Sequence, residues 1–142
     1  VAKEAIEADG VTVVDTVEDL YKKCQYISLH IPANAQTKKS INHKLMSLMP
    51  AGATIVNTAR KEVICEEDLM KILAERNDFK YVSDIAPDCA GDIEAQFAGR
   101  FYFTPKKMGA QTAEANINAG LAAANQIEKF FKLGDKTFAV NR

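Results

Sequence analysis

Short apolar segments typical of β-strands alternate along this chain with segments typical of helices, and this alternation most constrains the fold. The strand-like segments lie at residues 11–14, 26–31, 53–57, 81–85 and 100–103. The helix-like segments lie at residues 16–24, 43–48, 66–75 and 112–133, and the last of them is rich in alanine and stops at Gly134. Such alternation predicts an α/β fold with a parallel, doubly wound sheet.

Composition argues against several classes of partner and ligand. The net charge is −1 and no apolar run approaches the roughly 18 residues of a membrane span, so we expect neither nucleic acid nor a membrane as partner. The three cysteines form no closely spaced pair, which favours a cytoplasmic location over a disulfide framework. His30 and His43 are too far apart for zinc-ligand spacing, so we expect no metal site.

Four segments directly follow predicted strands, at residues 30–32, 58–60, 84–89 and 104–110. In parallel α/β sheets, ligands bind at the carboxyl ends of the strands. Arg60 there has the fork of donors that grips a carboxylate, although a surface arginine at a strand end is an equally simple interpretation. Asp84 continues an apolar strand, where a carboxylate needs a partner such as a ligand carboxamide or the backbone amides of the protein itself.

Lys106 and Lys107 lie in the last of these segments, just before Gly109 and Ala110. A lysine beside a reacting carbonyl stabilises the developing oxyanion or supplies a proton, but a pair of solvated surface lysines would look the same in sequence. Gly109 and Ala110 before a helix allow a ligand to approach the backbone closely. No G-x-G-x-x-G and no P-loop occurs, so the chain itself shows no phosphate cradle.

The motifs, taken in order, resemble the D-2-hydroxyacid dehydrogenases over roughly residues 10–135. Residues 24–42 (CQYISLHIPANAQTKKSIN) and 48–60 (LMPAGATIVNTAR) are similar to two family segments, the second of which reads "iNtaRG" at its end. Residues 81–84 (YVSD) resemble "aaLD", and residues 103–105 (FTP) with 109–115 (GAQTAEA) resemble "TPHiggsT-eA". The resemblance implies a Rossmann-like sheet, NAD as cofactor and hydride transfer at C2 of a 2-hydroxy or 2-keto acid.

The resemblance also implies a role for individual residues. Arg60 matches the arginine that binds the substrate carboxylate and polarises its carbonyl, and with Thr58 and Ala59 it lies on the nicotinamide side. Asp84 matches the aspartate that binds the carboxamide. The remaining matches are Ile31 and Pro32, in a loop against the cofactor, and Gly109 and Ala110, which follow the catalytic position.

Three departures from the family pattern stand out. The family histidine of T-P-H is replaced, and counting back from Gly109 places Lys107 there, with Lys106 as the alternative. The glutamate that pairs with this histidine falls on Cys89, next to Asp88. Arg60 is followed by Lys61 where the family has glycine. A short subgroup of phosphoglycerate dehydrogenases is similar in using lysine, and this points to oxidation of 3-phosphoglycerate to 3-phosphohydroxypyruvate, as in serine biosynthesis.

In the family, the G-x-G-x-x-G strand lies upstream of the position that Val1 occupies here, and Val1 itself falls inside a helix-like segment. We therefore interpret residues 1–111 as the C-terminal part of an NAD-binding domain, and residues 112–142 as a helix and tail that return to the substrate domain. The alternatives are an inactive half-domain that serves as an interaction module and a dehydrogenase for glyoxylate or hydroxypyruvate. When complete, the protein is expected to be a homodimer, and this part alone to be inactive.

Overall fold

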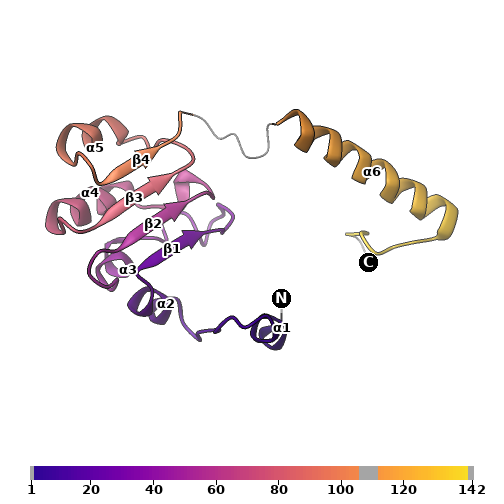
Figure 1. Cartoon of the computed structure of the whole chain (residues 1–142), viewed down its shortest axis with the longest axis horizontal. Coiled ribbons are helices and arrows are strands. Elements are labelled where there is room, and N and C mark those ends of the chain that lie inside the picture. Colours follow the sequence, from indigo (N-terminus) through magenta and orange to yellow (C-terminus); the bar gives the residue numbers. More distant parts are fainter. Residues whose placement is uncertain (1, 106–111, 141–142) are drawn as a thin grey trace. The chain divides into compact units, whose positions relative to one another are not determined.

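The computed structural model describes residues 2–105 and 112–140 in two compact units, Val1–Lys106 and Lys107–Arg142. In the first unit, strands and helices follow one another along the chain (Figure 1). The helices are α1 (Lys3–Ala8), α2 (Val17–Lys23), α3 (His43–Ser47), η1 (Lys61–Val63), α4 (Glu66–Glu75) and α5 (Ala90–Gln96). The strands are β1 (Tyr26–Leu29), β2 (Thr54–Asn57), β3 (Lys80–Ser83) and β4 (Phe101–Phe103).

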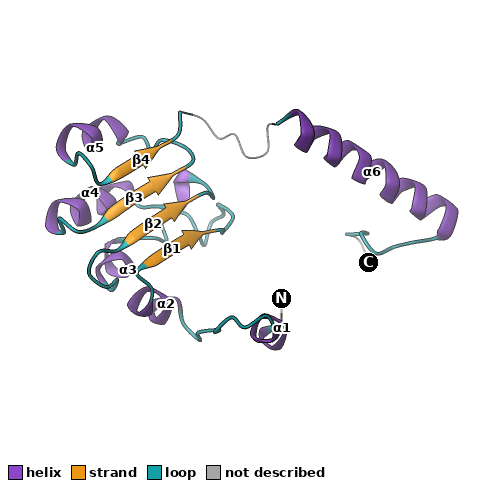
Figure 2. Ribbon diagram, viewed as in Figure 1, coloured by secondary structure: helices purple, strands orange, loops and turns teal. Residues whose placement is uncertain are grey.

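The four strands form one parallel sheet in the order β1-β2-β3-β4, which confirms the predicted α/β fold. Each connection crosses to the next strand along, so the reversal of order that makes a sheet doubly wound does not fall among these four strands. Because parallel crossovers are right-handed, successive steps in one direction place their helices on the same face of the sheet. Figure 2 shows the resulting alternation of strands and helices.

The side chains of the sheet show that α3, α4 and α5 cover one of its faces. Ile27, Ile55 and Tyr81 are register neighbours, and all three are buried in a core shared with α3, α4 and α5. On the opposite face, Tyr26 and Tyr102 keep 69% and 62% of their surface exposed. The apolar run of β2 had predicted cover on both faces, whereas in this unit its alternate side chains are only half buried.

The predicted helix starts follow from local hydrogen bonds. The side chain of Thr16 accepts a hydrogen bond from the amide of Asp19 at 3.1 Å, and that of Asn42 accepts one from the amide of Leu45 at 3.2 Å. Helix α4 has the predicted bounds and buries its apolar stripe. In contrast, residues 11–14 form no strand, and Val11 is exposed, because no described strand lies beside them to complete a hydrogen-bonded ladder.

The second unit contains one long helix, α6 (Ala113–Leu133). The hydroxyl of Thr112 accepts a hydrogen bond from the amide of Ala115 at 3.0 Å, and the left-handed Gly134 (φ 66°) ends the helix, so both predicted boundaries are confirmed. Among the helices of the described residues, none is both long enough and apolar enough to cross a membrane.

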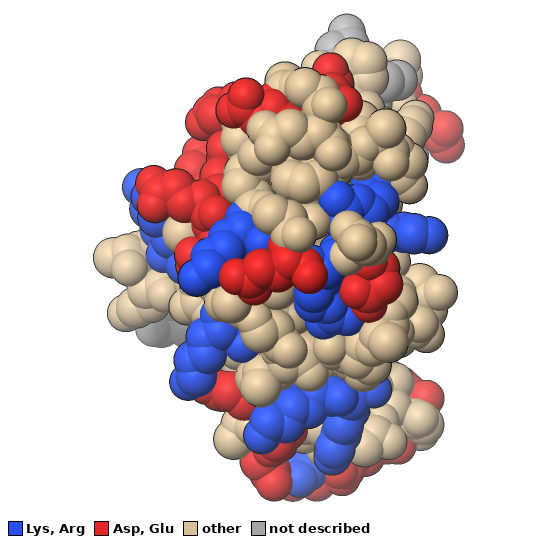
Figure 3. All heavy atoms as spheres, turned by 90° about the vertical axis from the view of Figure 1, so that its left-hand side faces the viewer, with Lys and Arg blue, Asp and Glu red and all other residues tan. Residues whose placement is uncertain are grey.

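On the surface that Figure 3 shows, acidic and basic side chains are intermixed rather than separated by sign.

An ion pair after α4 fixes the turn before β2 and predicts a pH-dependent stability. Arg76 donates to the carbonyls of Met49 and Pro50 at 2.8 and 2.7 Å and to Asp78 at 2.6 Å. Asp78 also accepts from the amide of Gly52 at 2.6 Å, a turn residue with φ +73°. Arg76 and this amide hold the pKa of the Asp78 carboxyl well below its ordinary value.

Asp78→Asn is therefore expected to lower the free energy of unfolding at pH 7. A carboxyl whose pKa is lowered by folding stabilises the folded protein at pH values above its unfolded-state pKa of about 4. This stabilisation is lost as the pH falls through the folded-state pKa. The difference from the wild type should shrink steadily below about pH 4. Urea titrations at pH 7 and at lower pH measure it, with Asp15→Asn as the matched control, because Asp15 is 89% exposed. An equal difference at every pH would contradict the prediction.

Candidate functional site

One row of register neighbours ends the sheet at its carboxyl edge. Leu29 pairs with Asn57, Asn57 with Ser83, and Ser83 with Phe103. The segments predicted to carry the chemistry leave the sheet from this row, so residues 31–32, 58–60, 84 and 104 all begin at the same edge. The structure thus brings together the candidate residues that lie in its described part.

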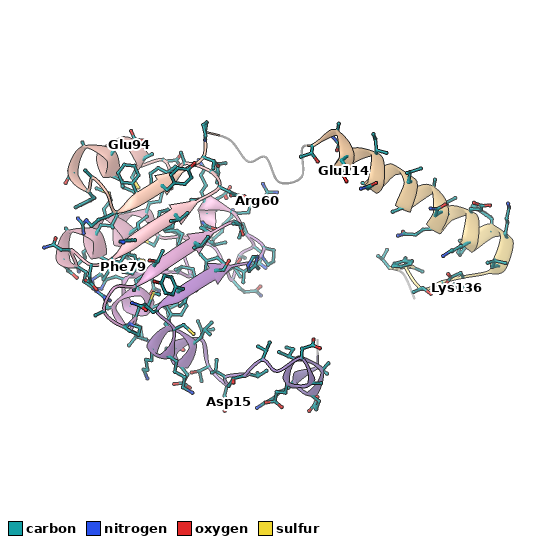
Figure 4. The ribbon with its side chains drawn as sticks, viewed as in Figure 1. Asp15, Arg60, Phe79, Glu94, Glu114 and Lys136 are labelled. Carbon is teal, nitrogen blue, oxygen red and sulfur yellow. The ribbon has the colours of Figure 1, made fainter. Side chains whose placement is uncertain are left out.

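The turn that presents Arg60 is held by one buried side chain. Asn57 is fully buried, and its Oδ1 accepts a hydrogen bond from the amide of Ala59 at 3.0 Å. Its Nδ2 donates to the carbonyl of Arg60 at 3.1 Å and to the hydroxyl of Tyr81 at 3.1 Å. The backbone from Thr58 to Arg60 is therefore fixed from below, while the Arg60 side chain is exposed and extends at the arrowhead end of the strands (Figure 4).

Asp84 begins the loop after β3 and is anchored through its backbone. Its amide donates to the carbonyl of Asn57 at 3.1 Å, and its carbonyl accepts from the hydroxyl of Thr104 at 2.7 Å. The Ser83 Oγ before it lies 3.1 and 2.8 Å from the carbonyl oxygens of Asn57 and Ile85, which share its single hydroxyl hydrogen. These bonds tie the ends of β2, β3 and β4 together, so Asp84 occupies a fixed position next to the Arg60 turn.

The loop after β1 is compact. Ile31 packs against the core, and Pro32 is exposed. The carbonyl of Pro32 accepts a hydrogen bond from the hydroxyl of Thr37, and the Asn34 side chain accepts from the amides of Gln36 and Thr37 at 2.9 and 3.0 Å. These bonds close a turn that presents Ile31 and Pro32 at the same edge as Arg60 and Asp84.

Two segments that depart from the family pattern, at Lys61 and at residues 88–89, contact each other. Lys61, which follows Arg60, forms an ion pair with Asp88 at 2.5 Å, and the hydrogen bond to Asp88 raises the pKa of Lys61. The Glu66 carboxylate accepts hydrogen bonds from the amides of Asp88 and Cys89, both at 3.0 Å. A surface groove of about 920 Å³ is lined by these four residues and by neighbours of both charge signs. The loops after β2 and β3 are thereby joined outside the sheet as well as within it.

Comparison with known proteins identifies the family of this chain. Residues 1–91 match the NAD binding domain of the D-isomer specific 2-hydroxyacid dehydrogenases. The chain belongs to this family. It is 32% identical over 133 residues to the D-3-phosphoglycerate dehydrogenase of Methanocaldococcus jannaschii, which covers 93% of this chain and 25% of that protein. It is 29% identical over 136 residues to the enzyme of the same name from Escherichia coli K12, covering 92% of this chain and 33% of the relative.

A solved structure extends the comparison to the whole chain. The NAD⁺-bound 3-phosphoglycerate dehydrogenase of Entamoeba histolytica is 43% identical, with a TM-score of 0.78 over 99% of this chain and 50% of that one. The chain thus spans between a quarter and a half of the length of these relatives. Family membership confirms the resemblance read from the motifs, and it assigns NAD as the cofactor of the domain type.

The described residues fit this cofactor at the carboxyl edge of the strands, where parallel α/β sheets bind ligands. The half-buried Asp84 offers carboxylate oxygens for a carboxamide, and Ala59, Ile31 and Pro32 offer a mainly apolar border for a ring. Four of the predicted site residues, Lys106, Lys107, Gly109 and Ala110, lie outside the described residues. Among described residues, the sequence interpretation missed Asn57 as the support of the turn, although a polar residue at the end of an apolar run was a visible signal.

The resemblance in sequence matches Cys89 to the family glutamate, and the thiol of Cys89 does not offer the chemistry of a carboxylate. Burial, followed by the charge of Glu66, raises the pKa of the Cys89 thiol to about 12. The thiol is therefore neutral near pH 7 and carries no charge that would orient an imidazolium or an ammonium group. The loss of the glutamate is consistent with the absence of the family histidine.

Cys89 is also expected to resist alkylation. At pH 8 it should hold on the order of a thousandfold less thiolate than an unperturbed cysteine. Iodoacetamide labelling in a Cys24→Ser, Cys65→Ser background, followed by mass spectrometry, measures the rate. Glu66→Gln should accelerate labelling because it removes the neighbouring negative charge, whereas Glu94→Gln, on the same helix as the Cys89 cap, should not. Labelling of Cys89 at the rate of a free thiol would refute the prediction.

Proposed function

We propose that this chain is the C-terminal portion of an NAD-dependent dehydrogenase that oxidises 3-phosphoglycerate at C2 to 3-phosphohydroxypyruvate. Residues 1–111 would complete the NAD-binding domain, and residues 112–142 would return to the substrate domain. One observation carries the proposal: Arg60 and Asp84, which match the carboxylate and carboxamide residues of the family, leave the sheet from one row of register neighbours. Two matched residues at one edge are what the reaction needs.

The residues of this chain divide the work as follows. Arg60 binds the carboxylate of the acid with two parallel hydrogen bonds and draws charge from the adjacent C2 oxygen. Asp84 binds the carboxamide, and Thr58, Ala59, Ile31 and Pro32 border the ring. The resemblance in sequence gives Gly109 and Ala110 a cofactor-binding role as well. When bound, NAD supplies the acceptor for the hydride that leaves C2.

Lys107 supplies the proton chemistry in this proposal, with Lys106 as the alternative. In the oxidation, the C2–H bond breaks with its electron pair, the C2–O bond becomes a carbonyl, and the neutral lysine amine takes the hydroxyl proton. In the reduction, the ammonium form returns this proton to the C2 oxygen. In the reduction, the charge of this ammonium group also favours a keto acid that carries a phosphate, which supports 3-phosphohydroxypyruvate over glyoxylate.

A substrate series tests the proposal. The complete reading frame that encodes this chain is expressed, and the oxidation of NADH is followed with 3-phosphohydroxypyruvate, hydroxypyruvate and glyoxylate. We expect kcat/KM to be highest for the phosphorylated acid, by about 10 to 1,000 fold, since charge-assisted contacts are worth about 1.5–3 kcal/mol each. A higher kcat/KM for glyoxylate would overturn the assignment of 3-phosphoglycerate as the substrate. No turnover of any keto acid would favour the alternative of an inactive interaction module.

A further inference from the structure

A small polar network lies beneath the Arg60 turn, inside an otherwise apolar core. Asn57 and Ser83 are the buried polar residues among those that the structure describes, at 0% and 2% exposure. Tyr81, at 1% exposure, contributes its hydroxyl to the same network. Buried polar groups are costly unless they are hydrogen bonded, so a network kept in this position requires a structural reason.

The hydrogen bonds of the network converge on the Asn57 amide. Its two donor hydrogens are divided between the hydroxyl of Tyr81 and the carbonyl of Arg60, each at 3.1 Å. Its oxygen accepts from the amide of Ala59 at 3.0 Å. With both ends of the amide engaged, the side chain has one orientation, and the backbone of the turn inherits this orientation.

Tyr81 reaches Asn57 because of the register of the sheet. Tyr81 pairs with Ile55, and Ser83 pairs with Asn57, so Tyr81 and Asn57 are diagonal neighbours on the buried face. A long aromatic side chain spans such a diagonal. Burial also raises the pKa of Tyr81, which keeps the phenol neutral.

We propose that Tyr81 is a positioning residue for Arg60, acting through Asn57. Its hydroxyl holds the Asn57 amide in the orientation that fixes the Ala59 amide and the Arg60 carbonyl, and so sets where the Arg60 guanidinium meets a carboxylate. The second half of this inference rests on the proposed function, whereas the first half concerns the fold alone. The two halves therefore need separate measurements.

Hydrogen exchange in the product of the complete reading frame tests the first half. Tyr81→Phe removes the hydroxyl and keeps the ring. The amide of Ala59 should then exchange about tenfold faster, because the turn loses the stabilisation of one hydrogen bond. Tyr102→Phe is the matched control: the same change on the exposed face of the sheet, which should leave Ala59 unaffected. The amide of Ile72 in α4 reports general opening and should be unchanged in both variants. Unchanged exchange at Ala59, or an equal rise at Ile72, would overturn the inference.

Steady-state kinetics of the product of the complete reading frame test the second half. Tyr81→Phe should raise KM for the keto acid about tenfold and leave the KM for NADH within about threefold of wild type, because the contact of Arg60 with the substrate carboxylate is what weakens. Any fall in kcat reports the weaker pull of Arg60 on the C2 oxygen. A rise in both KM values, or no change in either, would contradict a role in placing Arg60. A wild-type protein without dehydrogenase activity would overturn the proposed function and this half, while exchange at Ala59 would still decide the first half.

Discussion

Lys107→Ala in the complete protein is expected to lower kcat by about a hundredfold to ten-thousandfold, the usual contribution of a positioned acid or base. The reason is the proposed match in sequence: counting back from Gly109 puts Lys107 where the family pattern has its histidine, whereas counting forward from Pro105 gives Lys106. Lys106→Ala is the matched control, because it removes the same charge one residue away, and it should lower kcat by less than about tenfold. Stopped-flow measurement of NADH oxidation separates the chemical step from product release. Equal losses in the two variants, or a larger loss in Lys106→Ala, would reverse the assignment.

The family pattern has a histidine and a glutamate where this chain has Lys107 and Cys89, so the two positions can be tested together. Lys107→His alone should stay impaired, because an imidazole here lacks the carboxylate that would orient it and stabilise its charged form. Adding Cys89→Glu restores the family pair, and kcat should then rise at least about tenfold over Lys107→His. In the Lys107 background, Cys89→Glu should give no such gain. Simple additivity of the two changes would show that these positions do not act together.

Arg60→Ala is expected to lower kcat/KM for the keto acid by about a hundredfold to ten-thousandfold, since two charge-assisted hydrogen bonds are worth about 1.5–3 kcal/mol each. Arg60→Lys keeps the charge but loses the planar fork, so it should recover only part of this loss. The free energy of unfolding should change little, because the Arg60 side chain is exposed and the bonds of the turn use its backbone. Denaturant titration checks this, and a loss of activity that only follows a loss of stability would contradict the role of Arg60.

Most of the fold could be predicted from local patterns. The bounds of α4 follow from the period of its apolar stripe, and the starts of α2, α3 and α6 follow from Thr16, Asn42 and Thr112, whose side chains bond the backbone within three residues. The four observed strands were also predicted, with ends that differ by one or two residues: three predictions were too long, and β3 begins one residue before and ends two residues before its predicted range. Each of these features is decided by neighbours in sequence.

Features that depend on distant partners could not be predicted. The strand expected at residues 11–14 has the right residues but no strand beside it, and α5 is short, with Gly91 weakening its signal. Lys61 and Asp88 were both noticed as departures, yet nothing in sequence indicates that they pair across 27 positions. The bond between Tyr81 and Asn57 depends on the register of two strands in the same way. The sequence could therefore suggest which residues to look for at this edge of the sheet, but not the hydrogen bonds and the ion pair that hold the loops there.

The most direct test of the central claim is to follow the hydride itself. The product of the complete reading frame is incubated with 3-phosphohydroxypyruvate and NADH that is deuterated at the transferable C4 position, and the recovered acid is analysed by mass spectrometry and NMR. We expect one deuterium at C2 for each cofactor oxidised, and a loss of this label in Arg60→Ala at the same substrate concentration. Recovery of the keto acid unreduced, or reduction without deuterium at C2, would contradict the assignment of this chain to a working 2-hydroxyacid dehydrogenase.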